Sequence, residues 1–293
     1  MTAATATAAI AATPPARSGF VAFVRRHPTV AIGGALLVAI VVAAIAAPML
    51  GTVDPISINP SQRLRGMSAE HWFGTDRFGR DLYSRVIYGG RVSLIVGLSV
   101  AGLATLIGLT IGLVSGYLRT VDKVVMRVMD GMMAIPAIML AIALIALSKA
   151  SILIVIVAVT LPEVPRVVRL VRSIVLTLRE QQYIEAATAI GTSVPRILLR
   201  HLLPNALPPL IVQATYICAS AVLIEAALSF LGAGTPPEIP SWGNIMAEAR
   251  PYFQLKPSMV LLPGLFLAVT VLAFNLVGDG LRDMLDPRLA RRM

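Results

Sequence analysis

Charged residues are scarce in this sequence. They make up 14% of its 293 residues, whereas 57% are hydrophobic. A soluble domain of this length carries roughly a quarter charged residues. This deficit, together with a mean hydropathy of +0.81, excludes an ordinary soluble protein and places the chain in the membrane class.

Cysteine and the common catalytic motifs are also missing. The single cysteine, Cys218, can form neither an internal disulfide nor a cysteine metal cluster. The three histidines have no metal-ligand spacing, and the sequence contains no P-loop, GxGxxG, GxSxG or HExxH motif. We therefore expect no metal site, no bound cofactor and no means of hydrolysing ATP or a peptide bond in this chain.

The positive charge of the chain is dispersed. The net charge is +10, but the basic residues lie in short segments between apolar runs. Nucleic-acid binding needs basic residues gathered on a soluble face, so we expect no nucleic-acid partner. Short basic segments of this kind are typical of the loops that flank transmembrane helices.

The sequence contains six apolar segments that are candidates for transmembrane helices. A bilayer core of about 30 Å requires roughly 20 apolar residues in a helix. The fourth is the least regular, because Glu163 and three arginines interrupt its second half. The sequence therefore predicts an all-α membrane protein with six transmembrane helices and a tight turn at 148–150. The predicted spans are Val30–Leu50, Val92–Leu118, Gly131–Ser148, Ser151 to about Leu178, Ala206–Leu231 and Pro257–Gly278.

The spans divide the chain into five parts. We expect an N-terminal tail at 1–28, a first transmembrane helix at 29–50, an outer loop at 51–91, a core of five helices at 92–280 and a C-terminal tail at 281–293. Arginine and lysine are more numerous in the segments that face inward when the N-terminus is inside. Both termini are therefore expected in the cytoplasm. The first apolar run is too long for a signal peptide and is expected to remain as a span.

A polar segment at 179–204 separates the fourth and fifth spans. Its first part favours a helix, Gly191 can take the positive φ that ends a helix, and Pro195 suits the first turn of a second helix. Pro204 is expected to stop that second helix. We predict a cytoplasmic helical hairpin with an apolar face for a partner protein, and an ordinary interfacial amphipathic helix is the alternative. The residues of this face are Ile184, Ala187, Ile190, Val194, Ile197 and Leu198.

Two carboxylates fall inside predicted spans. Glu225 lies in the fifth, and Glu163 lies in the fourth between two prolines. An ionisable residue at this depth is costly and usually faces the protein interior or a water-filled path. Both residues are candidates for lining a translocation path. The alternative is a buried acid bonded to the backbone or to a neighbouring subunit.

The segment after the first span mixes aromatic residues, glycines and paired charges. This composition suits a folded cap at the outer membrane interface, where tryptophan and tyrosine anchor. The cap could meet a binding protein, or it could pack on the other spans as a structural plug. Its candidate residues are Trp72, Asp76, Arg80 and Asp81.

Several segments together resemble one family. EAATAIG at 185–191 with HLLP at 201–204 is similar to the EAA loop of ABC importer permeases. The remaining segments resemble the C-type permeases of dipeptide and oligopeptide importers, and the resemblance covers about residues 20–290. These segments are HWFGTDRFGRDLYSR at 71–85, GGRVSL at 89–94, SFLG at 229–232, PSWG at 240–243, GDGLRD at 278–283 and LDPR at 285–288.

The resemblance implies a type I ABC importer permease fold in a bacterial inner membrane, with the loop at 179–204 as the coupling helix that docks on an ATPase. It implies three kinds of partner: a homologous second permease, two ATPase subunits that carry ATP and Mg, and an extracytoplasmic binding protein. Small peptides are the expected cargo, with glutathione, nickel complexes or opines as alternatives. The remote alternative is a stand-alone secondary transporter or channel. The coupling residues carried over are Glu185, Ala186, Ala187, Gly191, Pro195, His201 and Pro204.

Overall fold

The computed structural model describes residues 24–148 and 151–285, which form helices joined by loops. Most of the two predicted tails, and part of the predicted turn at 148–150, lie outside these residues. The helices are α2 (Pro28–Ile45), α3 (Leu82–Tyr117), α4 (Arg119–Met133), α5 (Ala137–Ala146), α6 (Ile152–Arg179), α7 (Gln182–Ala189), α8 (Val194–Ile197), α9 (Leu203–Phe230), α10 (Trp242–Ala249) and α11 (Ser258–Leu285).

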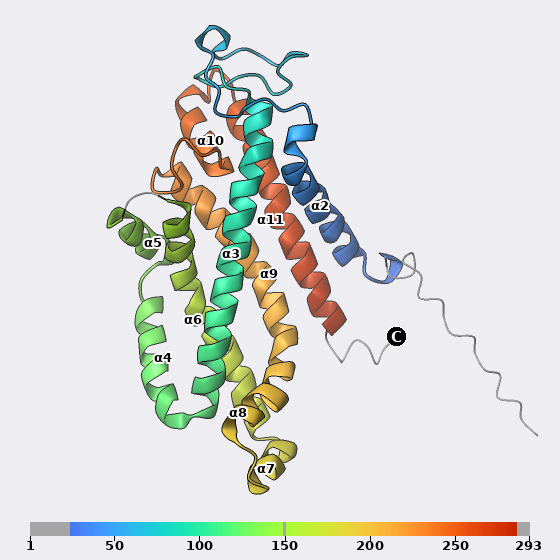
Figure 1. Ribbon diagram of the computed structural model, residues 1–293, viewed down its shortest axis with the longest axis vertical. Coiled ribbons are helices and arrows are strands. Elements are labelled where there is room, and N and C mark those ends of the chain that lie inside the picture. Colours follow the sequence, from blue (N-terminus) through green and yellow to red (C-terminus); the bar gives the residue numbers. More distant parts are fainter. Residues whose placement is uncertain (1–23, 149–150, 286–293) are drawn as a thin grey trace, which may run out of the picture.

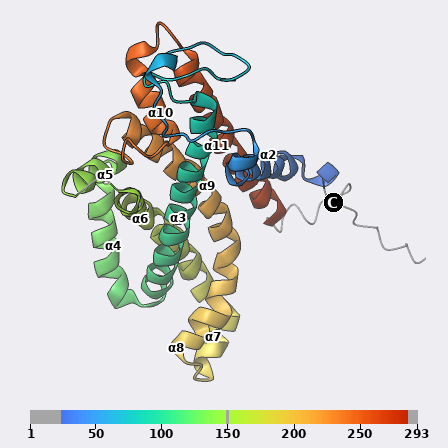
Figure 2. The same cartoon turned by 45° about the horizontal axis from the view of Figure 1, so that its top comes forward.

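The long helices run side by side and separate two very different ends (Figure 1). At one end the loop at 51–81 and α10 form a compact layer, which we call the cap. At the opposite end α7 and α8 project beyond the other helices, and we call residues 182–202 the hairpin. Figure 2 shows the same separation after a rotation, so the two ends are remote from each other.

Most of the predicted spans appear as long helices. α2, α3, the continuous stretch Val194–Phe230 and α11 are each long and apolar enough to cross a membrane. α6 forms at the predicted place and is 28 residues long, or about 42 Å at 1.5 Å per residue. Because α6 contains several charged residues, it is not among the helices that are apolar enough to cross a membrane by composition. The number of six spans therefore remains a prediction.

The third predicted span, Gly131–Ser148, is wrong as a single helix. α4 and α5 share this region and are bent by 85° relative to each other. Pro136 stands immediately before α5. Proline disfavours the helical conformation of the residue before it, which accounts for the end of α4. Apolarity alone could not reveal this break, because both sides of it are hydrophobic.

The predicted outer segment at 51–91 includes the start of a helix. α3 begins at Leu82, so the last ten residues of this segment form its first turns. The carboxylate of Asp81 caps the helix, since its Oδ2 accepts a hydrogen bond from the backbone N–H of Ser84 at 2.7 Å. The start of α3 is therefore fixed by a residue of the loop that precedes it.

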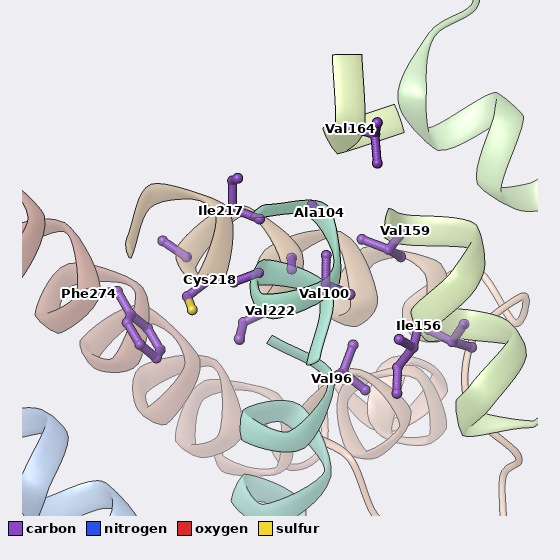
Figure 3. Packing of buried hydrophobic residues seen from close by; sticks show 14 of the residues in the cluster. Val96, Val100, Ala104, Ile156, Val159, Val164, Ile217, Cys218, Val222 and Phe274 are labelled. Carbon is purple, nitrogen blue, oxygen red and sulfur yellow. The ribbon is translucent and has the colours of Figure 1, made fainter. Parts of the chain in front are cut away.

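α3 is the central helix of the core. Figure 3 shows Val96, Val100 and Ala104 of α3 among the buried side chains, with Val159 of α6 and Val222 of α9 close by. These side chains are small or β-branched, which lets the three helices approach closely. The core has no single centre and follows α3 for most of its length.

Glycines set the spacing between α3 and α6. A Cβ added at Gly112 would lie 2.7 Å from Cβ of Val171, and one added at Gly116 would lie 2.7 Å from Cβ of Val175. Such distances are too short for real side chains, so only glycine fits. Gly108 and Val167 repeat the arrangement one turn earlier. The three glycines and three valines, which we call the glycine–valine ladder, hold the two helices together in parallel.

Candidate functional site

The hairpin turns at Gly191, as the sequence predicts. Gly191 has a φ of +79°, a conformation that side chains disfavour. Its N–H donates to the carbonyl of Thr188 at 3.0 Å, and the N–H of Thr192 donates to the carbonyl of Ala187 at 3.0 Å. This pair of bonds is the Schellman arrangement, which satisfies the last carbonyls of a helix. α7 therefore ends at a defined point and sends the chain back toward the bundle.

The second half of the hairpin differs from the prediction. Pro195 lies in the first turn of α8, as expected, and Ser193 occupies the preceding cap position without a side-chain hydrogen bond. Pro204 does not stop this helix but lies in the first turn of α9. A π-helical turn at Leu198–Leu202 joins the two helices. A proline is tolerated in a first turn because its missing N–H leaves no bond unmade there.

Only part of the predicted apolar face is available to a partner. Ile184 and Ile197 are buried and belong to the main hydrophobic core, so they are not available to a partner. Ala187 is also buried. The exposed apolar residues are Ile190, which is 82% exposed, and Val194. Tyr183 and Leu199, which the predicted face did not include, are exposed as well.

The predicted coupling residues lie on both sides of the hairpin. Glu185, Ala186 and Pro195 are exposed. The ring of His201 lies 6.4 Å from the ring of Tyr183, so the two halves of the hairpin meet there. A cavity of about 620 Å³ opens beside α7, toward the turn between α3 and α4. It is lined by Tyr117, Arg119, Arg179, Ile184, Glu185, Thr188 and Ala189.

Glu225 is fully buried in α9. Its Oε1 accepts a hydrogen bond from Ser229 at 2.8 Å, and its Oε2 accepts one from Ser93 of α3 at 3.3 Å. Ser229 and Ser241 are both within hydrogen-bond distance of the hydroxyl of Thr235. The carboxylate is thus surrounded by hydroxyl groups that join α3, α9 and the loop before α10.

Glu163 lies at the contact of α6 and α9. Its Oε1 accepts hydrogen bonds from Arg166 at 3.1 Å and from Ser220 of α9 at 3.2 Å. The carboxylate is buried, whereas half of the Arg166 side chain is exposed. Glu163 and Arg166 of α6 therefore form an ion pair in which the carboxylate is buried in the core and the arginine side chain is half exposed.

A buried network of ion pairs joins the loop of the cap and the start of α3 to α10. Asp76 accepts from Arg80 at 2.6 Å and from Arg85 at 2.5 Å. Arg85 also pairs with Glu248 of α10 at 2.9 Å, and Arg80 pairs with the same carboxylate. The network contains two acids and two bases, so its charges balance. The spacing of Asp76 and Arg80 is visible in the sequence, but no sequence signal connects them to Glu248.

The remaining cap residues have separate roles. Asp81 caps α3 and also contacts the ring of His71 at 2.9 Å. Trp72 is exposed and packs against Tyr83, with ring centroids 4.8 Å apart. Lys256 donates to the carbonyl of Leu64, and burial lowers the pKa of this lysine. The buried polar residues of the cap are thus bonded inside the molecule, while Trp72 is exposed.

Comparisons with known proteins place the chain in a family. Residues 104–291 match the family described as binding-protein-dependent transport system inner membrane component. A probable peptide ABC transporter permease protein of Sinorhizobium fredii is 51% identical over 92% of this chain and 92% of that protein. A dipeptide transport system permease protein of Alkalihalophilus pseudofirmus is 43% identical over 90% and 88%. A glutathione transport system permease protein of Pectobacterium atrosepticum is 39% identical over 91% and 89%.

The fold has a counterpart among solved structures. The MetNI methionine ABC transporter, solved in inward-facing conformations, contains a chain that matches with a TM-score of 0.58 and 22% identity. The match covers 68% of this chain and 94% of that one. At this identity the likeness concerns the fold alone. The chain is therefore a multi-pass membrane protein with an ABC importer permease fold, and it belongs to the family of binding-protein-dependent transport system inner membrane components.

Proposed function

We propose that this chain is one of two permease subunits of an ATP-driven importer of small peptides in a bacterial inner membrane. Relatives named as peptide and dipeptide permeases, at 51% and 43% identity over most of the chain, support the cargo. A second permease would complete the path, and an extracytoplasmic protein would deliver the peptide. The cap would then face outward, and the hairpin and both termini would face the cytoplasm.

The hairpin carries the proposal that separate ATPase subunits drive this chain. It projects beyond the other helices (Figure 1), and it exposes the apolar side chains of Ile190 and Val194. Its turn is fixed by the Schellman bonds at Gly191. A rigid projecting element with an apolar tip suits a groove in a partner protein. ATP and Mg would be held by that partner, and ATP binding would move the hairpin and open the path outward.

The test of coupling is Gly191→Val. A β-branched residue at a positive φ is strained by about 1–2 kcal/mol, so the hairpin should leave its native geometry while the helix bundle stays intact. In reconstituted complex, we expect normal assembly of the two permeases but loss of peptide-stimulated ATP hydrolysis and of uptake.

The matched control is Gly51→Val. Gly51 also has a positive φ, of +68°, with open space around it, but it lies at the cap end. The same strain there should leave ATP hydrolysis and uptake nearly unchanged. Wild-type stimulation and uptake in Gly191→Val would refute the coupling role of the hairpin. Uptake by this chain alone in liposomes would point instead to a self-sufficient transporter.

The cargo needs its own test, because a glutathione permease is also among the relatives. The extracytoplasmic binding protein encoded with this chain should bind di- and oligopeptides more tightly than glutathione, nickel complexes or opines. Tighter binding of any of these competitors would keep the importer architecture and replace the peptide cargo.

A further inference from the structure

Two arginines on α6 are exposed at a depth where the neighbouring helix is apolar. The side chains of Arg166 and Arg169 are 50% and 44% exposed. Val167, between them, packs on Gly108 of α3. Gly108 belongs to the uncharged stretch Val92–Leu118 and lies about 15 Å from its hairpin-side end. The arginines are thus well inside the membrane, where a charge facing lipid is costly.

The exposed face of α6 changes along the helix. The cap-side half exposes only apolar side chains, and the hairpin-side half exposes only polar ones. Val157 and Arg166 are nine residues apart, which is about two and a half turns and places them on opposite sides. One face of α6 is therefore suited to lipid and the other to water. The apolar residues are Leu153, Val157 and Leu161, and the polar residues are Arg166, Arg169, Ser173 and Thr177.

Ion pairs hold the two arginines without covering them. Arg166 is held by the buried carboxylate of Glu163. Arg169 donates to Asp130 of α4 at 2.5 Å, and the Asp130 side chain is itself 57% exposed. Both guanidinium groups remain partly exposed, although one of their two partners, Glu163, is buried. Pairing reduces the cost of these charges in the membrane, but the open pairs still need a polar environment.

The break between α4 and α5 lies next to these charges. Asp130 is in the last turn of α4, and the N–H of Ala134 donates to its carbonyl at 3.1 Å just before the 85° bend. Ala134, Ile135 and Pro136 are exposed. Irregular backbone at membrane depth is tolerated only where it is buried in protein or lines a water-filled cavity. The bend is a second observation, independent of the arginines, that excludes lipid from this side.

We infer that the hairpin-side half of α6, from Arg166 to Thr177, lines the water-filled translocation path together with the α4–α5 bend. This inference rests on the proposed transport function and assigns the path to residues other than Glu225. Polar cargo that passes through would meet Arg166 and Arg169, whose guanidinium groups donate to carboxylates. Glu163 positions Arg166 from the core.

The test uses single cysteines in the Cys218→Ser background, in the complete complex in proteoliposomes. Ser173→Cys and Thr177→Cys report on the polar face, and they change no charge and no ion pair. Val157→Cys and Leu153→Cys are matched controls on the apolar face of the same helix. The probe is a membrane-impermeant sulfonated methanethiosulfonate, applied from the hairpin side without nucleotide and with trapped ATP.

We expect Ser173→Cys to react at least about tenfold faster than Val157→Cys in one of the two states, because the thiolate is the reacting species and needs water. Its modification should block uptake, whereas modification of Val157→Cys should not. Equal, slow reaction of the two faces in both states would overturn the inference and indicate that the polar face packs against the second permease. A parent complex that transports no peptide with ATP would instead refute the proposed function, whatever the labelling shows.

Discussion

The cap end contains buried charged residues, whereas the charged residues of the hairpin are exposed. At the cap end, Asp76 and Arg80 of the loop and Arg85 of α3 are buried and form ion pairs among themselves and with Glu248 of α10. In the hairpin, Glu185 and Ile190 are exposed. The charges of this network are therefore satisfied within the chain. The hairpin buries the apolar side chains of Ile184 and Ile197 and exposes those of Ile190 and Val194.

This difference predicts that the cap end contributes to the stability of this subunit and that the hairpin contributes to the binding of a partner protein. Substitutions in the cap should act on the folding of this subunit, because its charges lose their partners inside the same chain. Substitutions at the tip of the hairpin should act on association with another protein. Arg85, the least exposed arginine of the ion-pair network, and Ile190, the most exposed apolar residue of the hairpin, test this distinction most directly.

The largest effect is expected for Arg85→Met. Removal of one member of a buried ion pair costs about 3–5 kcal/mol, because the remaining charge is left without a partner. We expect a large loss of folded subunit, measured as the yield of complex and its thermal midpoint in detergent. The exposed Asp54→Asn is the control and should change neither quantity.

The double variant Arg85→Met with Glu248→Gln sharpens this prediction. It removes one positive and one negative charge, so the network stays balanced and part of the loss should be recovered. A single Arg85→Met variant with wild-type yield and midpoint would mean that the cap charges do not stabilise the fold.

A smaller effect is expected for Glu225→Ala. The substitution removes the acceptor of the Ser93 and Ser229 hydroxyls and leaves a cavity, at a cost of about 2–4 kcal/mol. Glu225→Gln keeps the size of the side chain and an acceptor, so it should retain most of the stability and of the uptake. Both variants are to be measured for complex yield and transport. Normal assembly with lost transport in Glu225→Gln would return this residue to the translocation path.

The smallest effect on this subunit is expected for Ile190→Ser. The side chain is 82% exposed, so the stability of the permease should change by less than about 0.5 kcal/mol. Its affinity for the ATPase should nevertheless fall, since an apolar contact in the proposed groove is lost. Retention of ATPase on immobilised complex measures this. A destabilised permease with unchanged ATPase retention would show that Ile190 acts in the folding of this subunit and not in binding the ATPase.

The sequence predicted the features that depend on neighbouring residues. The position of α6, the turn at Gly191 and the start of α8 before Pro195 follow from apolar length and from the conformational limits of glycine and proline. It failed at Pro204 and at the α4–α5 bend, for related reasons. A proline can begin a helix or end one, and which of the two occurs depends on the helices that pack around it.

The candidate site was predictable only in part. The EAA segment fixes the place of the hairpin, but the burial of Ile184 and Ile197 depends on tertiary packing in the hydrophobic core. The pairing of Arg85 with Glu248 joins residues 163 positions apart, and no local pattern encodes it. The exposure of Arg169 likewise depends on which face of α6 the other helices leave uncovered.

The glycine–valine ladder limits how the transporter can move. Gly108, Gly112 and Gly116 form three equal notches along α3, each occupied by one valine of α6. Small sliding of α6 along α3 would drive the valines into the ridges between notches. The two helices can therefore move together as one rigid body, or α6 can shift its register along α3 by four residues, which is about 6 Å. α3 starts beside the cap and α6 leads toward the hairpin, so in the proposed coupling mechanism a displacement of the hairpin would be transmitted to the cap end through these two helices.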